Sequence, residues 1–269
     1  MTAFSYDGKH VVITGAHSGM GYETTRLLLD AGASVTALDV EDVDLPVKEF
    51  LRCDLADPSV IGETVGAIGD RVDVLMNCAG IPQTHPGIEV MKVNVLGLRD
   101  LTEALLPRIP RGGSVVNIAS AAGGGWEAHR DEIADLLATP DFGAGVAWCN
   151  DHLDGLGDPY FFSKEVLTYY TYWRSAQTIH DGVRMNSISP GATASRMLDD
   201  FRKVIPEKTL NGSYEQIGIG RPGEPAEMAG AMLYLGSDEA SYVNGHNLYL
   251  DGGFQAALTT GQIDVTKLV

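Results

Sequence analysis

The sequence predicts an α/β fold. We expect a single doubly wound domain over residues 1–269, with a seven-stranded, mainly parallel sheet that carries helices on both faces. Short β-branched runs alternate with segments of helical periodicity along the chain, which is typical of βαβ units. A glycine-rich turn joins the first strand to the first helix, as in Rossmann-type domains. The length of 269 residues suits one large α/β domain better than two.

The first βα unit carries the glycine pattern. Residues 10–14 predict a buried strand, and residues 22–31 predict a helix that ends at Gly32. Bare backbone N–H groups at a helix N-terminus bind a pyrophosphate, whose approach larger side chains would block. The turn therefore predicts a dinucleotide site, and the alternative is a structural turn with chance glycines. The cofactor-binding candidates in the turn are Gly15, Ser18, Gly19, Met20 and Gly21.

An acidic residue after the second strand indicates which dinucleotide binds. Residues 34–38 predict this strand, and Asp39 closes it. A carboxylate about 20 residues beyond the glycine turn binds the 2'-hydroxyl of the NAD ribose and repels the 2'-phosphate of NADP. Ser18 stands in the turn in place of a basic residue that would favour NADP. The sequence therefore predicts NAD as the cofactor.

Two further strand ends extend the predicted cofactor crevice. Residues 50–53 and 72–76 predict the third and fourth strands, with a helix at 58–69 between them. Ligands of parallel sheets bind at the carboxyl ends of the strands. We expect Asp54 to reach the adenine amine and Gly80 to let the backbone approach the cofactor. The cofactor-binding candidates at these two ends are Asp54, Leu55, Asn77, Ala79 and Gly80.

Composition and terminal sequence limit the partners and the compartment. Acidic residues outnumber basic ones, 36 to 19, which argues against nucleic acid or an anionic membrane as a partner. The three cysteines suggest neither a disulfide framework nor a zinc ribbon, and the potential ligands around Cys149 lack a metal-site spacing, so we expect no metal. No signal pattern and no membrane-length apolar run is visible, which predicts a cytoplasmic protein.

Tyr160 and Lys164 form the candidate reaction centre. Pro159 suits the first turn of a helix that we predict to extend to about His180. Residues four apart lie on one helix face, where a lysine ammonium can lower the pKa of a phenol from its usual value near 10. Such a phenol can exchange a proton with an alcohol or ketone. The alternative is an ordinary exposed helix face that carries the pattern by chance.

Three motifs resemble the short-chain dehydrogenase/reductase family. They are Thr14-Gly15-x-x-x-Gly19-x-Gly21, Asp54 after the third strand, and Asn77-Cys78-Ala79-Gly80, in which the family usually has Asn at the place of Cys78. The resemblance covers nearly the whole chain. It implies an NAD-linked oxidoreductase, assembled as a homotetramer whose subunit contacts involve the C-terminal end.

The resemblance also assigns catalytic roles. Ser120 follows a strand predicted at 113–119 and would hold the substrate oxygen. Tyr160 would be the acid/base, and Lys164 would bind the nicotinamide ribose and tune the pKa of the tyrosine. Asn94 would hold a proton-relay water, although the residues alone leave a plain helix-surface amide as the alternative.

The remaining elements follow in order. A long helix is predicted from about residue 88 to 106, a sixth strand at 183–189, a helix at 225–236 and a seventh strand at 247–250. By resemblance, the backbone of Ile188 would pair with the nicotinamide carboxamide. The segment that follows resembles the family's Pro-Gly-x-x-x-Thr motif, with Ser195 in the last place. By the same resemblance, the cofactor-binding candidates in this segment are Pro190, Gly191 and Thr193, and the hydroxyl of Thr193 would lie near the carboxamide.

Two segments are expected to shape the substrate pocket. An insertion at about 124–158, with a helix at 128–137, separates Ser120 from Tyr160, and a mobile lid is expected at about 195–220. The connection after Gly80 is short. This combination resembles one branch of the family, the bacterial 3α-hydroxysteroid dehydrogenase/carbonyl reductases.

These observations predict an NAD-dependent enzyme that interconverts a secondary alcohol and a ketone. The apolar content of the insertion and lid suggests a cyclic, hydrophobic or steroid-like substrate. One alternative is a sugar-nucleotide epimerase or dehydratase, which uses similar NAD and tyrosine chemistry but usually has an added C-terminal domain. The other is a non-catalytic NAD-binding sensor protein, which the presence of Ser120, Tyr160 and Lys164 disfavours.

Overall fold

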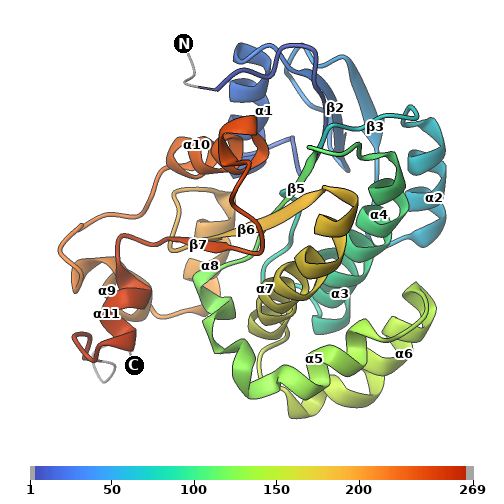
Figure 1. The fold of residues 1–269 in the computed structure, drawn as a ribbon. Helices are drawn as coiled ribbons and strands as arrows, with labels where there is room; N and C mark the ends of the chain where they lie inside the picture. The colour runs from blue at the N-terminus through green and yellow to red at the C-terminus, as the bar shows by residue number, and fades with distance from the viewer. Residues whose placement is uncertain (1–3, 265–269) are drawn as a thin grey trace.

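The computed structural model describes residues 4–264 and contains one seven-stranded sheet in the order β3-β2-β1-β4-β5-β6-β7 (Figure 1). All neighbouring strands are parallel, which confirms the predicted sheet. The strand order reverses between β1 and β4, and a ligand crevice is expected there. The strands are β1 (His10–Thr14), β2 (Ser34–Asp39), β3 (Glu49–Arg52), β4 (Val74–Asn77), β5 (Ser114–Ile118), β6 (Arg184–Pro190) and β7 (Asn247–Leu250).

Helices cover both faces of this sheet. Successive side chains of β1 alternate between the faces, so Val11 and Ile13 belong to one apolar cluster and Val12 to the other. The first cluster packs under α1 and α10, and the second under α2, α4 and α7. Each face is therefore buried by its own helix layer. These helices are α1 (Gly19–Asp30), α2 (Pro58–Ala67), α4 (Leu98–Leu105), α7 (Pro159–Thr178) and α10 (Pro225–Gly236).

The long helix predicted at 88–106 is present but is not a uniform α-helix. It consists of α3 (Gly87–Met91), a π-helical segment (Lys92–Gly97) and α4. π-Helical turns inside α-helices are rare and occur mostly at functional sites. Asn94 lies inside the π-helical segment, fully buried rather than on the helix surface.

The insertion forms more helix than the sequence indicated. A 3₁₀ segment (Ala121–His129) leads into α5 (Arg130–Leu137), and α6 (Phe142–His152) follows. α6 was not predicted, because Gly143 and Gly145 weaken its helical signal. A Cβ at Gly145 would lie 2.5 Å from a methyl of Leu96, so the glycine permits α6 to pack against the π-helical segment. In Figure 1 both helices lie together at one end of the molecule.

The segment predicted as a lid also contains regular structure. Two nine-residue helices, α8 (Arg196–Val204) and α9 (Glu207–Glu215), are separated at Pro206. Each is too short to give a long periodic pattern in the sequence. A further short helix, α11 (Phe254–Thr259), follows β7 and lies beside α9 (Figure 1).

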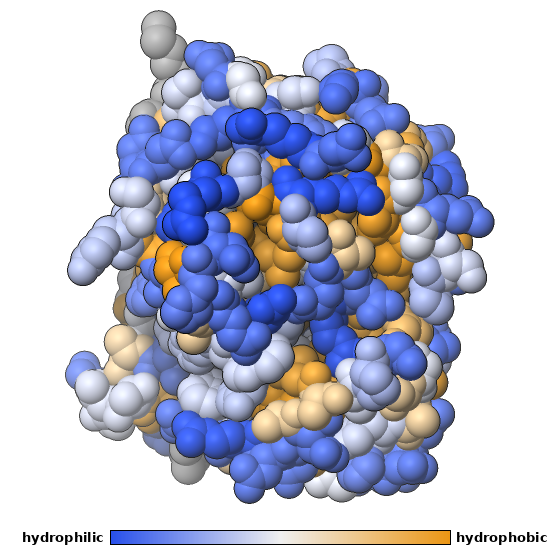
Figure 2. Space-filling view, turned by 45° about the vertical axis from the view of Figure 1, so that its right-hand side comes forward, coloured by the Kyte–Doolittle hydropathy of each residue, from blue (hydrophilic) through white to orange (hydrophobic). Residues whose placement is uncertain are grey.

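The outer surface is largely hydrophilic on the face that Figure 2 shows. Figure 2 shows hydrophilic side chains over most of one face, with hydrophobic ones gathered in the hollows between them. Within residues 4–264, no helix has the length and apolar character that would let it cross a bilayer.

A close backbone approach at Gly97 gives a stability prediction. A Cβ added there would lie 2.0 Å from the carbonyl oxygen of Leu55. Gly97→Ala should therefore lower the free energy of unfolding by about 1–3 kcal/mol, because the packed core must shift to admit a methyl group. Urea unfolding measures the change. Gly62→Ala on α2 is the control, since a Cβ there meets nothing within 4 Å and alanine favours helix. Equal effects of the two substitutions would contradict the prediction.

Candidate active site

The glycine turn between β1 and α1 is shaped by close backbone contacts. Gly15 has a φ of +71°, and a Cβ on it would lie 2.7 Å from the backbone of Ala79. A Cβ on Gly21 would lie 2.0 Å from the carbonyl oxygen of Gly15. Gly19 has a φ of +58° and is the first residue of α1. The atom nearest to a Cβ added at Gly19 is the Cβ of Ser195, at 3.7 Å. Two glycines therefore permit tight packing, and the third leaves the helix N-terminus open, which fits a pyrophosphate.

Asp39 lies beside this turn, as the sequence predicted. Its carboxylate accepts hydrogen bonds from the backbone N–H groups of His17 (2.9 Å) and Glu41 (3.0 Å). The end of β2 and the glycine turn are thereby held together. Asp54 is exposed at the next strand end and accepts from the N–H of Ala56 at 2.8 Å.

Some predicted cofactor residues turn their side chains away from the crevice. Leu55 is buried in the apolar cluster under α2 and α4. The Asn77 amide is buried as well, and its Nδ2 donates to Thr102 Oγ1 (3.0 Å) and Asn117 Oδ1 (2.8 Å). The side chains of Leu55 and Asn77 therefore hold the sheet and its helices in place, which leaves only their backbone groups for a ligand.

Tyr160 and Ser120 meet at the carboxyl end of the sheet. The side chains of Tyr160 and Ser120 come together although the whole insertion separates them in the sequence, and Ser120 acts to lower the pKa of the Tyr160 phenol. Tyr160 is 6% exposed and begins α7, where Asp158 caps the helix by accepting from its backbone N–H at 2.8 Å. Phe201 of α8 packs edge-on against the phenol ring, with centroids 5.1 Å apart. The reacting hydroxyl is thus held among apolar neighbours.

Lys164 lies one turn further along α7 and is 4% exposed. Its Nζ lies 5.6 Å from the centre of the Tyr160 ring and donates to the carbonyl oxygen of Ile118 at 3.2 Å. The predicted placement on one helix face is therefore confirmed.

The predicted lowering of the pKa of Tyr160 is wrong for the protein alone. Burial raises the pKa of this phenol to about 12, against the opposing hydrogen bond from Ser120. Burial also lowers the pKa of Lys164 to about 8. Both shifts have burial as their largest cause, because desolvation disfavours the charged form of a buried group.

Asn94 connects three segments around the site. Its Oδ1 accepts from the N–H of Ile81 (2.8 Å), and its Nδ2 donates to the carbonyl oxygen of Ile81 (3.1 Å) and to Ser163 Oγ (3.2 Å). Ser163 in turn donates to the carbonyl oxygen of Tyr160 at 2.7 Å. The side chain of Asn94 therefore fixes the loop after β4 against α7.

A cavity of about 540 Å³ opens between the glycine turn, the start of α7 and the lid helices. Predicted residues on its wall are Met20, Gly80, Ser120, Tyr160, Lys164, Pro190, Gly191, Thr193 and Ser195. Further wall residues that sequence reasoning did not single out include Gln83, Phe161, Met197, Phe201, Tyr214 and Phe254. Met197, Phe201 and Tyr214 belong to the lid, and their apolar character was visible in the sequence, but the convergence of the six residues was not.

The insertion does not contribute to this wall. Among the described residues that line the cavity, none comes from 124–158. Its apolar side chains, such as Ile133, Leu136 and Trp148, are instead buried in the cluster shared with α7. The expectation that the insertion shapes the pocket directly therefore differs from what the structure shows, because these side chains face the core.

The structure also changes the predicted role of Ile188. This residue lies inside β6, and its carbonyl oxygen already accepts from the N–H of Ala119 at 2.9 Å. Thr193 lies further along the chain, in a parallel bridge with Gly223. In this bridge the two neighbours of Thr193 make the hydrogen bonds, because the N–H of Ala194 donates to the carbonyl oxygen of Gly223 and the carbonyl oxygen of Ala192 accepts from the N–H of Gly223. Because the N–H and C=O of a residue in such a bridge point away from its partner, the backbone of Thr193 is better placed than that of Ile188 to face a ligand.

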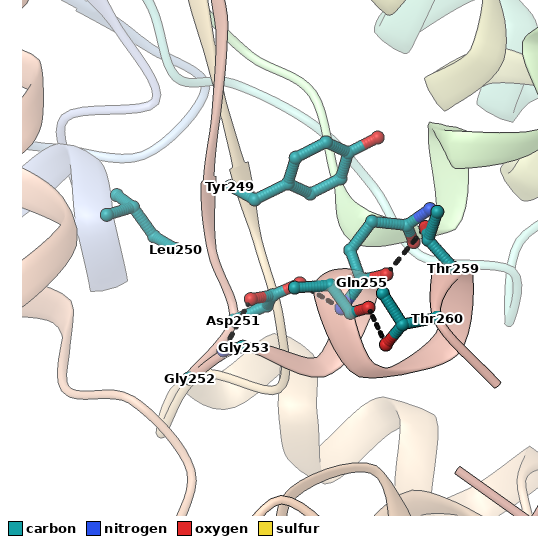
Figure 3. Close-up of a pocket in the computed structure, with 9 residues that line it drawn as sticks. Tyr249, Leu250, Asp251, Gly252, Gly253, Gln255, Thr259 and Thr260 are labelled. Carbon is teal, nitrogen blue, oxygen red and sulfur yellow. Dashed lines mark hydrogen bonds between the residues drawn. The ribbon is translucent and has the colours of Figure 1, made fainter. Parts of the chain in front are cut away.

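A second, open groove of about 630 Å³ lies beside α11 (Figure 3). Its polar groups are largely used in local hydrogen bonds. Thr259 Oγ1 donates to the carbonyl oxygen of Gln255, and the Asp251 carboxylate accepts from the N–H groups of Gly253 and Gln255, all at 2.8 Å. This groove therefore offers no separate reaction centre. Within residues 4–264 there is also no cluster of three metal-ligating side chains.

Comparison with known proteins matches both halves of the chain to family models. Residues 9–130 match the model described as short chain dehydrogenase, and residues 154–255 match the model described as Enoyl-(Acyl carrier protein) reductase. The unmatched stretch between them contains nearly all of α5 and α6. Residues 131–153, the greater part of the insertion, thus lie outside both matched segments.

Individual relatives match over nearly their whole length. The chain is 32% identical to coniferyl-alcohol dehydrogenase from a Pseudomonas strain, covering 91% of this chain and 96% of that protein. It is 29% identical to 3-alpha-hydroxysteroid dehydrogenase/carbonyl reductase of Comamonas testosteroni, covering 94% and 98%. The solved 3-alpha-hydroxysteroid dehydrogenase from Pseudomonas sp. B-0831, complexed with NADH, superimposes with a TM-score of 0.74 at 25% identity, covering 94% and 99%.

The buried ammonium of Lys164 predicts a stability cost at neutral pH. The pKa is about 8 in the folded protein and 10.5 for an ordinary lysine. The unfolded chain therefore binds the proton more tightly, so the cost is fully present below pH 8 and is lost as the pH rises toward 10.5. Lys164→Met removes this cost but also removes the hydrogen bond to the carbonyl oxygen of Ile118. The net effect should be a rise of about 1–3 kcal/mol in the free energy of unfolding at pH 7.

Urea unfolding of wild type and variant between pH 6.5 and pH 9.5 measures this effect, with the exposed Lys48→Met as the control. The gain from Lys164→Met should shrink as the pH rises. A gain that stays constant over this range, or appears equally in the control, would contradict the assignment.

Proposed function

Because the chain belongs to the short-chain dehydrogenase family and is an oxidoreductase of the alcohol dehydrogenase type, we propose that it interconverts a secondary alcohol and a ketone with NAD. The proposed substrate is cyclic and hydrophobic, and includes steroid-like or aryl-substituted alcohols. The observation that carries this proposal is the convergence of Tyr160 and Ser120 in the wall of one largely apolar cavity, with Lys164 one turn of α7 away from Tyr160.

The residues at the strand ends fit a dinucleotide. The glycine turn would bind the pyrophosphate, Asp39 the adenosine ribose, and Lys164 the nicotinamide ribose, with the backbone at Thr193 near the carboxamide. The carboxylate of Asp39 already accepts two backbone hydrogen bonds beside the turn, and a carboxylate at this place would repel the 2'-phosphate of NADP, which supports NAD over NADP. The bound nicotinamide supplies the acceptor or donor of the hydride.

The chain itself handles the proton and the substrate oxygen. In the oxidation direction, Tyr160 as phenolate takes the hydroxyl proton of the alcohol, and in the reduction direction its phenol returns that proton to the ketone oxygen. Ser120 donates a hydrogen bond to the same oxygen as charge develops on it. A phenol whose pKa is about 12 must be shifted toward neutrality in the working complex. The positive charges of Lys164 and of the oxidised nicotinamide both act in that direction.

The cavity wall supports an apolar, ring-containing substrate. Phe161 and Phe201 flank Tyr160, and α8 and α9 add further aliphatic side chains around it. Aromatic side chains that line a cavity bind flat, apolar ligands through large contact areas. Relatives named for coniferyl alcohol and for a hydroxysteroid agree with this class of substrate.

Tyr160→Phe tests the reaction centre. Oxidation of a panel of cyclic, aryl and steroid secondary alcohols with NAD should occur in the wild type and fall by about 10²–10⁴-fold in kcat in the variant, since the acid/base hydroxyl is lost. Absorbance of the reduced cofactor reports turnover, and NADH fluorescence should show nearly intact binding. Tyr242→Phe, at a fully exposed position, is the control. Wild-type turnover by Tyr160→Phe would overturn the assignment.

Asp39→Ser tests the cofactor preference separately. Removing the carboxylate should raise kcat/KM for NADP relative to NAD by about tenfold or more, because a like-charge contact near the surface costs on the order of 1–4 kcal/mol. Glu41→Ser is a matched control, since Glu41 is an exposed acid two residues away. Equal rates of the wild type with NADP and NAD would refute the role given to Asp39.

A further inference from the structure

Phe201 brings the lid into contact with the proposed acid/base. The rings of Phe201 and Tyr160 lie with their centroids 5.1 Å apart and their planes at 67°, which is a favourable arrangement for two aromatic side chains. Phe161 also lies beside the phenol, at a centroid distance of 6.2 Å, but 45% of its surface is exposed. Phe201 is nearer to the phenol ring and less exposed, so its ring belongs to the immediate surroundings of the reacting group.

One face of α8 lines the active-site cavity. Met197, Phe201 and Ile205 are spaced four residues apart, and all three lie in the cavity wall, with Ile205 directly after the helix. Residues with this spacing share a face of a helix. The side chains of Asp199 and Arg202, by contrast, are exposed and pair with each other at 2.8 Å. The lid therefore meets the cavity through an apolar surface that has Phe201 at its middle.

The cofactor and the substrate must share this cavity of about 540 Å³. Its wall includes Met20 of the glycine turn and residues 190–193, which the proposed function gives to the dinucleotide. The substrate would occupy the remaining volume, whose wall contains the lid residues. Because Phe201 packs directly against Tyr160, an alcohol whose oxygen lies at Tyr160 and Ser120 has its carbon skeleton next to Phe201. Packed side chains leave little free volume, so the size of Phe201 limits the size of that skeleton.

We infer that Phe201 is a specificity-determining residue, which limits the ring system that contains or carries the carbinol carbon of the substrate. This inference rests on the proposed function and narrows its substrate class to secondary alcohols with a single ring at this place. A fused second ring overlaps with the ring of Phe201 or displaces α8. In hydrophobic pockets one methylene group changes the specificity by about 10–200-fold, so a whole ring should have a clear effect.

Two matched pairs of alcohols test the inference. The first pair is 1-phenylethanol and 1-(2-naphthyl)ethanol, which carry the same reacting group and differ by one fused ring. The second pair is cyclohexanol and 2-decalol, which differ in the same way without an aromatic ring. In the wild type, kcat/KM with NAD should be about tenfold or more higher for the single-ring member of each pair.

Variants with a smaller and a larger side chain separate a size limit from general damage. Phe201→Ala should raise the ratio of kcat/KM for the fused-ring over the single-ring alcohol by about tenfold or more, because it opens space beside Tyr160. Phe201→Leu should raise this ratio less, and it is the second variant if the first folds poorly. Phe201→Trp should lower the ratio below that of the wild type. A residue that only stabilised the lid would not move the ratio in opposite directions.

Val204→Ala is the matched control. Val204 belongs to the same helix, is 50% exposed and does not line the cavity, so its loss should leave the wild-type ratio unchanged. Thermal midpoints and NADH affinity verify that each variant is folded.

The outcomes distinguish this inference from the proposed function. If the wild type oxidises no member of the two pairs and no steroid alcohol, the proposed function fails. If the wild type oxidises fused-ring or steroid alcohols at least as well as the single-ring alcohols, the inference fails while the proposed function stands. The same holds if Phe201→Ala and Phe201→Leu both keep the wild-type ratio.

Discussion

The hydrogen bonds of one buried amide, that of Asn94, hold the parts of the candidate site together. Through Ile81 it fixes the loop that follows β4, and through Ser163 it reaches the first turn of α7, which contains Tyr160. Asn94 itself belongs to the π-helical segment, and its side chain is fully buried. One loop and two helices are thereby joined at a single buried side chain, which is the kind of support that preorganised sites require.

One group beside that junction is unfavourable for the fold when considered alone. The ammonium of Lys164 is buried in surroundings that disfavour its charged form, whereas the phenol of Tyr160 stays neutral at pH 7 and carries no such cost. The two apolar clusters, one on each face of the sheet, supply the burial that offsets the cost at Lys164. The side chains that stabilise the fold and the side chains of the candidate site therefore lie in different parts of the molecule. The strand ends and helix N-termini carry the polar groups, and the sheet faces carry the hydrophobic ones.

Much of this arrangement could be predicted from the sequence because it depends on local chemistry. Gly15, Gly21 and Asp39 were found from strand, turn and offset, and Tyr160 and Lys164 from helical spacing. Other features depend on tertiary packing and could not be predicted. The shifts in pKa at Tyr160 and Lys164 follow from burial, which spacing does not reveal. The sheet pairing of Ile188 and the inward turn of Asn77 depend on neighbouring strands.

The position of α5 and α6 has a consequence for how such a protein can diversify. These helices lie outside the segments matched by the family models and contribute to the core behind α7, whereas α8 and α9 line the cavity. Substitutions in the insertion therefore act first on the free energy of folding, and substitutions in the lid act first on what the cavity admits. The two kinds of change occupy separate stretches of chain. A gain in stability from one stretch can compensate a costly change of specificity in the other, and neither change needs to alter Tyr160.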